Sequence, residues 1–250
     1  MAKLRIVLVI VFATILLRQS ASWASGANLD LPAGSGPFPV VIMVPTCSGF
    51  GGFTGRVYER FSQTFVEAGF AVSRVDFLAP RGLSLCLGGS PPRRVVSMRD
   101  VGVDIYRAID ALAGNPALDA RRISLVGYSY GGGAILTALA GNDPARAKIH
   151  SVIVYYPDCA GLGPWSGSTP TLIFFGGADA VAPRAVCNAV MAQMPDTASI
   201  RIIEFPEAMH GFNFYLLPRS PGLNTIYGPM GYDPSAALRA RKAALRFLRR

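Results

Sequence analysis

One serine in this sequence lies in a pattern that is typical of a catalytic nucleophile. Residues 127–131 read GYSYG, which matches G-x-S-x-G, and they stand between a predicted strand, residues 123–128, and a predicted helix that begins at Tyr130. A sharp strand-to-helix turn holds such a serine in a strained conformation, and the flanking glycines avoid clashes that a Cβ would cause. We therefore predict that Ser129 is a nucleophile that attacks a carbonyl carbon.

A serine hydroxyl needs a base that removes its proton, and the sequence contains two histidines. His210 follows the last predicted strand, residues 200–205, on a loop at the carboxyl end of that strand. Loops at this end of a parallel sheet converge on one crevice. His150 begins a predicted strand, so a structural role is expected for it. We predict that His210 is the general base.

The imidazole in turn needs a carboxylate that holds its tautomer and stabilises its charged form. Asp179 follows the predicted strand 171–175, and the resulting chain order of serine, aspartate and histidine is one that serine hydrolases use. Asp158, which follows the preceding strand, and Glu207 remain as alternative acids. We expect Asp179 to orient His210.

The tetrahedral intermediate of such a reaction needs hydrogen-bond donors for its oxyanion. One expected donor is the backbone N–H of Tyr130, at the start of the helix. A second should come from the glycine-rich loop 45–52, which reads PTCSGFGG. The alternatives for this loop are a tight strand-to-helix turn or a phosphate cradle, but a phosphate loop would require G-K-[ST] and no lysine is near.

Apolar runs alternate with helical patterns along the chain, and this alternation positions the candidate residues. It predicts a mostly parallel sheet with helices on both faces, in a single α/β domain over residues 25–250. The predicted strands are residues 40–44, 70–77, 123–128, 149–156, 171–175 and 200–205. The predicted helices are residues 54–68, a long helix that starts at Pro91-Pro92 and runs through residue 112, and residues 130–140, 182–194 and 234–248.

Residues 1–24 have the three parts of a secretory signal peptide. Lys3 and Arg5 precede an apolar run, residues 6–17, which is too short to cross a bilayer, and small residues precede Ser25. Cleavage after Ala24 would remove three of the 24 basic residues and none of the 15 acidic ones, lowering the formal net charge from +9 to +6. We expect export to the periplasm or medium and no stable membrane insertion afterwards; an uncleaved anchor is the alternative.

The four cysteines are isolated, with no C-x-x-C pair, which disfavours a metal site. In an oxidising compartment some of them should pair. We expect Cys47 to pair with Cys86, and Cys159 with Cys187, because each pair would lie on neighbouring loops at one end of the sheet. Four buried free thiols are the alternative.

Composition and charge exclude several classes of protein. With 51% hydrophobic and 16% charged residues the chain is not disordered. The basic residues near the C-terminus fall on the polar side of an amphipathic helix, residues 234–248, and no nucleic-acid-binding motif accompanies them. We therefore expect no nucleic-acid partner.

Taken together, the motifs resemble the dienelactone hydrolase family of α/β-hydrolases over nearly all of the chain after the signal segment. The loop 45–52, the serine motif and the sequences APRG, GAD and MHGF carry the resemblance, MHGF being the most characteristic. The family prototype has a cysteine nucleophile, whereas this sequence has serine, as many relatives do. The loop also opens with Pro45-Thr46 in place of the usual His-Gly.

This resemblance implies an α/β-hydrolase fold and a triad of Ser129, Asp179 and His210. The short stretch between the predicted strands 149–156 and 171–175 leaves no room for a large helical lid. It also implies an oxyanion hole made by the backbone amides of Cys47 and Tyr130. The chemistry would be hydrolysis of a small-molecule ester or lactone through an acyl-enzyme, which requires no metal or organic cofactor. A peptidase, an acyltransferase or a non-catalytic exported binding protein are the alternatives.

Four further residues are candidates for substrate binding. Arg81 could hold a substrate carboxylate or pair with an acidic side chain. Phe50, Tyr128 and Phe212 could wall an apolar pocket or pack in the core. The loop 213–232 is expected to cover one side of the site, and the sequence leaves the natural substrate and the oligomeric state open.

Overall fold

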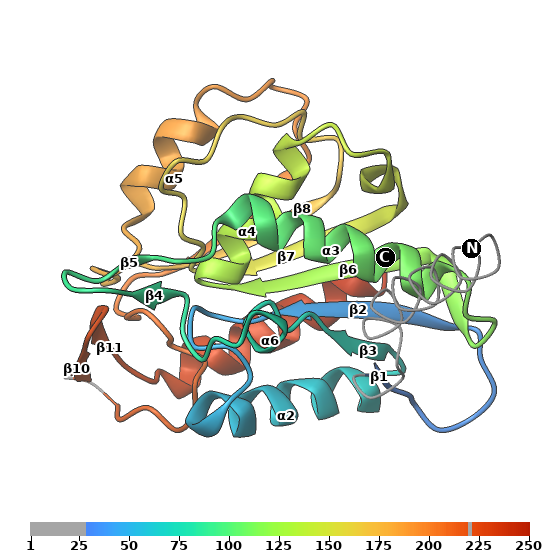
Figure 1. Cartoon of the computed structure of the whole chain (residues 1–250), viewed down its shortest axis with the longest axis horizontal. Helices are drawn as coiled ribbons and strands as arrows, with labels where there is room; N and C mark the ends of the chain where they lie inside the picture. The colour runs from blue at the N-terminus through green and yellow to red at the C-terminus, as the bar shows by residue number, and fades with distance from the viewer. Residues whose placement is uncertain (1–28, 220–221) are drawn as a thin grey trace, which may run out of the picture.

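A seven-stranded, mostly parallel sheet forms the centre of the protein (Figure 1). The computed structural model describes residues 29–219 and 222–250, so the predicted signal segment lies outside the described residues. The strands are β1 (Leu29–Asp30), β2 (Phe38–Val44), β3 (Ala71–Arg74), β6 (Leu118–Tyr128), β7 (Ile149–Tyr155), β8 (Thr171–Gly176) and β9 (Ile200–Phe205). Their order is β1-β3-β2-β6-β7-β8-β9, with β1 antiparallel to β3 and the other pairs parallel.

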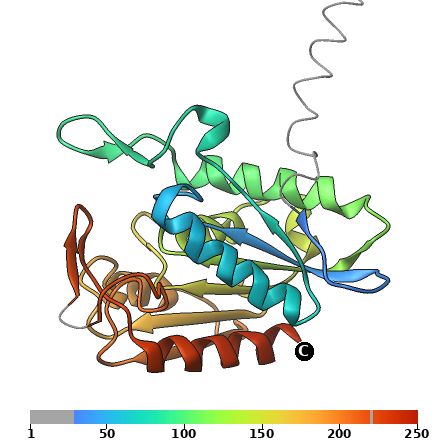
Figure 2. The same cartoon turned by 90° about the horizontal axis from the view of Figure 1, so that it is seen from below.

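Helices cover both faces of this sheet, as the view from below shows (Figure 2). One face carries α3 (Met98–Ala113), α4 (Tyr130–Ala140) and α5 (Arg184–Met191), and the other carries α2 (Gly52–Glu67) and α6 (Pro234–Leu248). Two short 3₁₀ helices, η2 (Ala79–Arg81) and η3 (Pro144–Lys148), lie in connections. The predicted α/β fold is thus confirmed.

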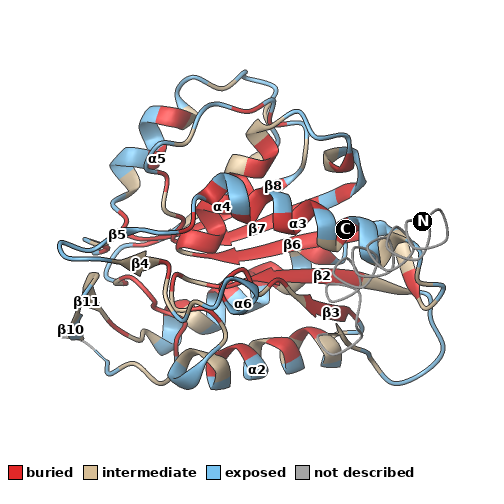
Figure 3. Cartoon of the chain, viewed as in Figure 1, coloured by how far each residue is buried: buried red, intermediate tan, exposed pale blue. Residues whose placement is uncertain are grey.

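The sequence of β2 explains why both faces need cover. Successive side chains of a strand point to opposite faces, so Ile42 packs with the α3 and α4 side while Val41 and Met43 pack with the α2 and α6 side. All three side chains are fully buried. Figure 3 shows the same burial along the central strands, whereas the outer surfaces of the helices are exposed. Continuous apolar runs are therefore what this sheet requires.

The start of α3 differs from the sequence-based expectation. Pro91 and Pro92 do not begin a helix; they lie in the turn of a small hairpin formed by β4 (Leu87–Gly88) and β5 (Arg93–Arg94). The helix begins at Met98, where the Ser97 side chain accepts a hydrogen bond from the Asp100 amide and the Asp100 carboxylate accepts one from the Ser97 amide. This capping box gives the amides of Ser97 and Asp100 a hydrogen-bond acceptor each, and it sets the start of the helix.

Both expected disulfides are present. Cys47 is bonded to Cys86 with Cα atoms 4.9 Å apart, and Cys159 to Cys187 with Cα atoms 5.1 Å apart. Cys47 and Cys86 lie on loops that follow β2 and β3, as expected, whereas the second bond joins Cys159, on the loop after β7, to Cys187 within helix α5. In the described part of the chain, no helix is long and apolar enough to cross a bilayer.

A second hairpin, β10 (Leu223–Thr225) and β11 (Gly228–Met230), lies at the same end of the molecule as the β4–β5 hairpin (Figures 1 and 2). Residues from both hairpins line a single cavity in front of Ser129. The segment between β7 and β8 contains no helix, in keeping with the expected absence of a helical lid there. Both hairpins therefore contribute to the wall of this cavity.

Candidate active site

Ser129 occupies a strained turn between β6 and α4. Its backbone angles are φ 51° and ψ −117°, in a region that non-glycine residues rarely adopt. A Cβ on Gly131 would lie 2.2 Å from the carbonyl oxygen of Pro45, and one on Gly127 would lie 2.6 Å from the Ile135 side chain. The turn therefore requires both glycines of the motif, because the chain before and after the serine is closely packed.

The Ser129 hydroxyl lies next to a histidine–aspartate pair. The distance from Ser129 Oγ to His210 Nε2 is 2.9 Å, and the distance from His210 Nδ1 to Asp179 Oδ2 is 2.7 Å. His210 and Asp179 are both buried. Three residues from separate loops thus form one continuous hydrogen-bonded chain, in the arrangement that activates a serine hydroxyl.

Backbone contacts hold the two partners of Ser129 in place. The second oxygen of Asp179, Oδ1, accepts hydrogen bonds of 2.9 Å from the amides of Val181 and Ala182, which leaves Oδ2 for the imidazole. The carbonyl oxygen of His210 accepts a 3.1 Å hydrogen bond from Gly231, directly after β11. The β10–β11 hairpin therefore helps to fix the loop that carries His210.

The Tyr156 ring packs against the imidazole of His210. Its ring centroid lies 4.6 Å from that of His210, and its hydroxyl donates a 2.6 Å hydrogen bond to Asn213 Oδ1. Burial raises the pKa of Tyr156 well above its usual value, so this hydroxyl stays a neutral donor. Tyr156 also has a positive φ of 38°. The sequence offered no motif that singles this residue out.

The alternative acids and base lie elsewhere. His150 is exposed near the start of β7, whereas Ser129 follows the carboxyl end of the neighbouring parallel strand β6, at the opposite end of the sheet. Asp158 pairs with Arg94 and accepts a hydrogen bond from Ala160. Glu207 is exposed. No hydrogen bond or ion pair links His210 to either alternative acid in the described residues.

Two backbone amides of the cavity lining have no protein acceptor among the described residues. Tyr130 is the first residue of α4, where helix amides have no intrahelical partner. Cys47 lines the same cavity as Ser129 and Tyr130, and its own carbonyl oxygen accepts a 2.9 Å hydrogen bond from Cys86. Among the described residues, neither amide donates to a protein oxygen. Both are therefore free to bind a developing oxyanion.

The cavity in front of Ser129 has a volume of about 540 Å³ and a largely apolar wall. Much of that wall comes from the segment 214–230, in agreement with the expectation that loop 213–232 covers one side. The hydroxyls of Tyr227 and Ser48 lie 3.4 Å apart and link the hairpin to the loop after β2. The apolar side chains of the cavity wall include Phe53, Val181, Phe214, Leu216, Leu217, Leu223, Ile226 and Met230.

The four candidate substrate-binding residues do not line this cavity. Arg81 donates to Asp104 Oδ2 at 2.6 Å and to the Phe77 carbonyl. Of the two roles considered for it, Arg81 therefore has the one of pairing with an acidic side chain. Phe50, Tyr128 and Phe212 pack in the core on the α2 and α6 side. Side chains alternate along a strand, and Tyr128 takes the opposite face from the cavity.

Arg94 is a cavity residue that the sequence did not indicate. It lies on β5, pairs with Asp158 and places its guanidinium 5.2 Å from the centre of the Tyr130 ring. Burial raises the pKa of Tyr130. In residues 29–219 and 222–250 no cluster of three or more His, Cys, Asp or Glu side chains forms a candidate metal site.

Comparisons with known proteins agree with this fold. A model of the dienelactone hydrolase family matches residues 26–250, while a comparison with curated proteins finds no significant match. Similar solved structures include a candidate dienelactone hydrolase from Klebsiella pneumoniae subsp. pneumoniae, with 18% identity and a TM-score of 0.67 over 89% of this chain and 91% of that chain.

Two further structures share the fold at similar identity. Thermogutta terrifontis esterase 2, phosphorylated by paraoxon, is 18% identical with a TM-score of 0.60 over 88% of this chain and 86% of that chain. A dienelactone hydrolase-like promiscuous phosphotriesterase from metagenomic libraries is 21% identical with a TM-score of 0.64 over 90% and 93%. Since the family match spans the entire central sheet and both hairpins, this chain belongs to the dienelactone hydrolase family of α/β-hydrolases.

Proposed function

We propose that this hydrolase cleaves carboxylic esters or lactones with Ser129 as the nucleophile. The observation that carries the proposal is the 2.9 Å contact between Ser129 Oγ and His210 Nε2, continued by the 2.7 Å contact to Asp179. A serine on a strained turn, facing an apolar cavity and two free amides, has each part that acyl transfer requires.

The reaction begins when His210 Nε2 takes the proton of Ser129 as the serine oxygen attacks the carbonyl carbon. The amides of Cys47 and Tyr130 bind the oxyanion, and Asp179 stabilises the imidazolium. His210 then gives the proton to the departing alcohol oxygen, which leaves an acyl-enzyme. Water, deprotonated by the same imidazole, attacks the acyl carbon and restores Ser129. In a lactone the departing alcohol oxygen belongs to the acyl chain itself, so the first step opens the ring and the second releases a single hydroxy acid.

The apolar wall of the cavity favours substrates with an apolar acyl or alcohol group. Its lining contains Arg94 as a cation, but Arg94 is paired with Asp158, so a strongly charged substrate has no free partner there. The related esterase from Thermogutta terrifontis is phosphorylated by paraoxon. We therefore expect paraoxon to modify Ser129 in this protein as well.

Hydrolysis of 4-nitrophenyl butyrate by the purified protein tests the proposal. Ser129→Ala should reduce kcat at least about 10³-fold, while His150→Ala, the matched change at the other histidine, should keep wild-type activity. Intact-mass and peptide analysis after paraoxon treatment should locate one phosphoryl group on Ser129. Equal activity and equal labelling in wild type and Ser129→Ala would refute the assignment.

A panel of esters, lactones and peptides then separates the alternatives. Activity on peptides with none on esters would indicate a peptidase, and product formation that requires an added alcohol would indicate an acyltransferase. Saturable binding of panel members without turnover or paraoxon labelling would indicate a binding protein. The proposal requires hydrolysis of an ester or lactone with release of the free acid.

We further propose that the protein is exported as a single domain, residues 25–250. Two disulfides support export, because such bonds persist in oxidising compartments. Expression of the full chain in a bacterial host, followed by fractionation and intact-mass analysis, tests this. A periplasmic product that begins at Ser25 is expected; a membrane-bound product that begins at Met1 would contradict it.

A further inference from the structure

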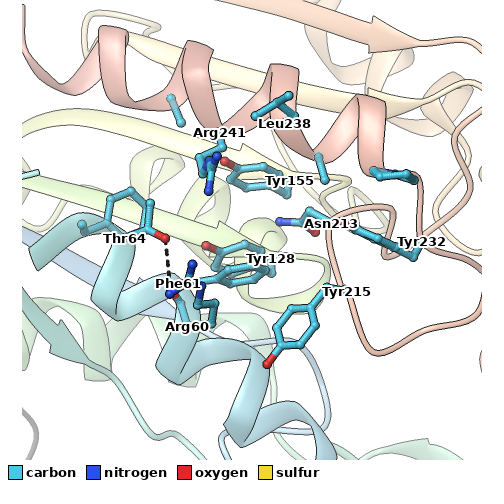
Figure 4. Close-up of a pocket in the computed structure, with 14 residues that line it drawn as sticks. Arg60, Phe61, Thr64, Tyr128, Tyr155, Asn213, Tyr215, Tyr232, Leu238 and Arg241 are labelled. Carbon is cyan, nitrogen blue, oxygen red and sulfur yellow. Dashed lines mark hydrogen bonds between the residues drawn. The ribbon is translucent and has the colours of Figure 1, made fainter. Parts of the chain in front are cut away.

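A second cavity lies between α2 and α6, on the face of the sheet that these two helices cover (Figure 4). It has a volume of about 420 Å³ and shares no lining residue with the cavity in front of Ser129. The segment just before α6 contributes Tyr232 to its wall. The ester-cleavage reaction proposed above uses none of its residues, so this cavity needs an explanation of its own.

Stacked aromatic rings form one wall of this cavity. The ring centroids of Phe61 and Tyr128 lie 5.2 Å apart with the planes inclined by 16°, and those of Tyr128 and Tyr155 lie 5.0 Å apart with the planes inclined by 15°. The three rings come from α2, β6 and β7, so one nearly parallel stack crosses the sheet. Such a stack offers an apolar surface to a small organic molecule.

Two largely buried tyrosines in this stack have hydroxyls that bind no protein group in the described part of the chain. Tyr128 is 1% exposed and Tyr155 is 4% exposed, yet neither hydroxyl has a hydrogen-bond partner among the described residues, and both residues line the cavity. Burial raises the pKa of both phenols, so they remain neutral O–H donors. Because both residues line the cavity, the two hydroxyls can donate hydrogen bonds to acceptor oxygens of a ligand there.

Asn213 adds a third donor. Its Oδ1 is occupied by the Tyr156 hydroxyl at 2.6 Å, while its amide nitrogen points into the cavity between Tyr128 and Tyr155 (Figure 4). Asn213 is buried, and its Nδ2 has no acceptor within the described chain. The side chain therefore presents N–H groups, rather than a carbonyl, to whatever binds here.

The charged residues of the cavity lining also favour a ligand with acceptor oxygens. Arg60 of α2 and Arg241 of α6 line the cavity from its two sides, and its lining includes no Asp or Glu. Neither arginine forms an ion pair with a carboxylate in the described residues, whereas Arg74, Arg81 and Arg184 do. Two unpaired guanidinium groups beside three neutral donors favour an anionic ligand, and guanidinium matches the geometry of a carboxylate.

We propose that the cavity between α2 and α6 is a second binding site, specific for a small organic carboxylate with an apolar body. Arg60 and Arg241 bind the carboxylate, and the Tyr128, Tyr155 and Asn213 donors hold its oxygen atoms or a further polar substituent. The stacked rings contact the apolar body. The inference is independent of the ester-cleavage proposal, because Ser129, Asp179, His210 and the two proposed oxyanion donors take no part in it.

Benzoate, a flat carboxylate, is the first probe, and benzamide is its neutral isostere. Titration calorimetry and ligand-observed NMR on the purified protein should show saturable benzoate binding and at least about tenfold weaker benzamide binding. Arg241→Ala, which removes a guanidinium, and Tyr155→Phe, which removes one O–H donor, should each weaken benzoate binding at least about tenfold. Lys242→Ala, an exposed neighbour with the same charge change, should bind as wild type does.

The variants also guard against loss of folding. Tyr155→Phe keeps the ring and removes a hydroxyl without a partner, so its melting temperature should equal or exceed that of the wild type. Arg60→Ala removes the other exposed guanidinium of the cavity, which lies on α2. Equal benzoate affinity in all variants, equal affinity for benzamide, or no saturable binding of benzoate, phenylacetate or butyrate up to about 10 mM would each overturn the proposal.

Discussion

Cys47 and Cys86 both line the cavity in front of Ser129 and are joined to each other by a disulfide. The bond ties the loop after β2 to the segment before the β4–β5 hairpin. A 2.9 Å hydrogen bond from the Cys86 amide to the Cys47 carbonyl oxygen runs parallel to it. The backbone of Cys47, one of the two proposed oxyanion donors, is therefore held by a covalent link 39 residues away in sequence.

Removal of this disulfide should lower activity as well as stability. In Cys47→Ala/Cys86→Ala we expect a stability loss of roughly 3–4 kcal/mol, from the larger entropy of the unfolded chain. We also expect kcat for ester hydrolysis to fall about tenfold or more, because one oxyanion donor is less well positioned. Urea unfolding and ester hydrolysis measured well below the melting temperature check both effects.

The second disulfide supplies the matched control. Cys159 and Cys187 do not line the cavity, so Cys159→Ala/Cys187→Ala should lose similar stability while the folded protein keeps nearly full kcat. Equal losses of kcat in the two double variants would show that the disulfides act on the fold alone.

The Asp179 carboxylate should be required for turnover. Asp179→Asn preserves size but changes the hydrogen bond to His210 Nδ1, so the imidazole takes the wrong tautomer; we expect kcat to fall about 10³- to 10⁴-fold. Glu207→Gln, an equivalent change at an exposed acid three residues before His210, should leave kcat unchanged. Ester hydrolysis by both variants gives the answer, and a similar kcat for Asp179→Asn and wild type would rule out the role.

Ile226 tests whether the β10–β11 hairpin contacts substrate. This side chain is 78% exposed although it lines the Ser129 cavity, so its replacement should leave stability unaffected. Ile226→Ala should raise KM for a hexanoate ester roughly three- to tenfold, because apolar contact is lost, and leave the acetate ester unchanged. Parallel KM and kcat measurements on the two esters check this, and a uniform effect on both would contradict it.

The capping box of α3 should make stability depend on pH. The hydrogen bond from the Ser97 hydroxyl lowers the pKa of Asp100 in the folded protein. A carboxyl group with a lowered folded pKa stabilises the fold above its unfolded pKa, and that contribution is lost as the pH falls through the folded pKa. Ser97→Ala should therefore cost about 1 kcal/mol at pH 7 and less in acid.

Denaturant unfolding of wild type and Ser97→Ala at pH 7 and at about pH 3 measures this difference. Ser235→Ala is the control, since Ser235 is an exposed serine in the first turn of α6 and its hydroxyl has no partner in the described chain. A difference between Ser97→Ala and wild type that is the same at both pH values would contradict the linkage to Asp100.

Local sequence patterns were sufficient for the framework of this protein. Apolar runs predicted the central strands, and helix α4, strand β9 and helix α6 begin and end where the sequence indicates. The G-x-S-x-G motif and the order of Ser129, Asp179 and His210 identified the residues that the fold brings into contact. These features depend on neighbours in sequence and on the rule that parallel strands present their carboxyl ends at one edge.

Other features needed the tertiary structure. The aromatic residues Phe50, Tyr128 and Phe212 could serve a substrate pocket or a core on sequence grounds, and the packing of α2 and α6 places them in the core. The partner of Arg81 lies 23 residues away on a different helix. Such contacts depend on which surfaces meet, and residue type alone does not specify that.

The sequence by itself determined the alternation of strands and helices, the strained serine turn and the identity of the candidate reactive groups, because each follows from local periodicity or a short motif. Tertiary structure alone decided that the segment expected to cover Ser129 forms the β10–β11 hairpin, that Tyr156 packs on His210 and binds Asn213, and that a second cavity with unpaired donors opens between α2 and α6. The physical reason is that these features are made of side chains distant in sequence, whose contacts form only when the helices pack on the sheet.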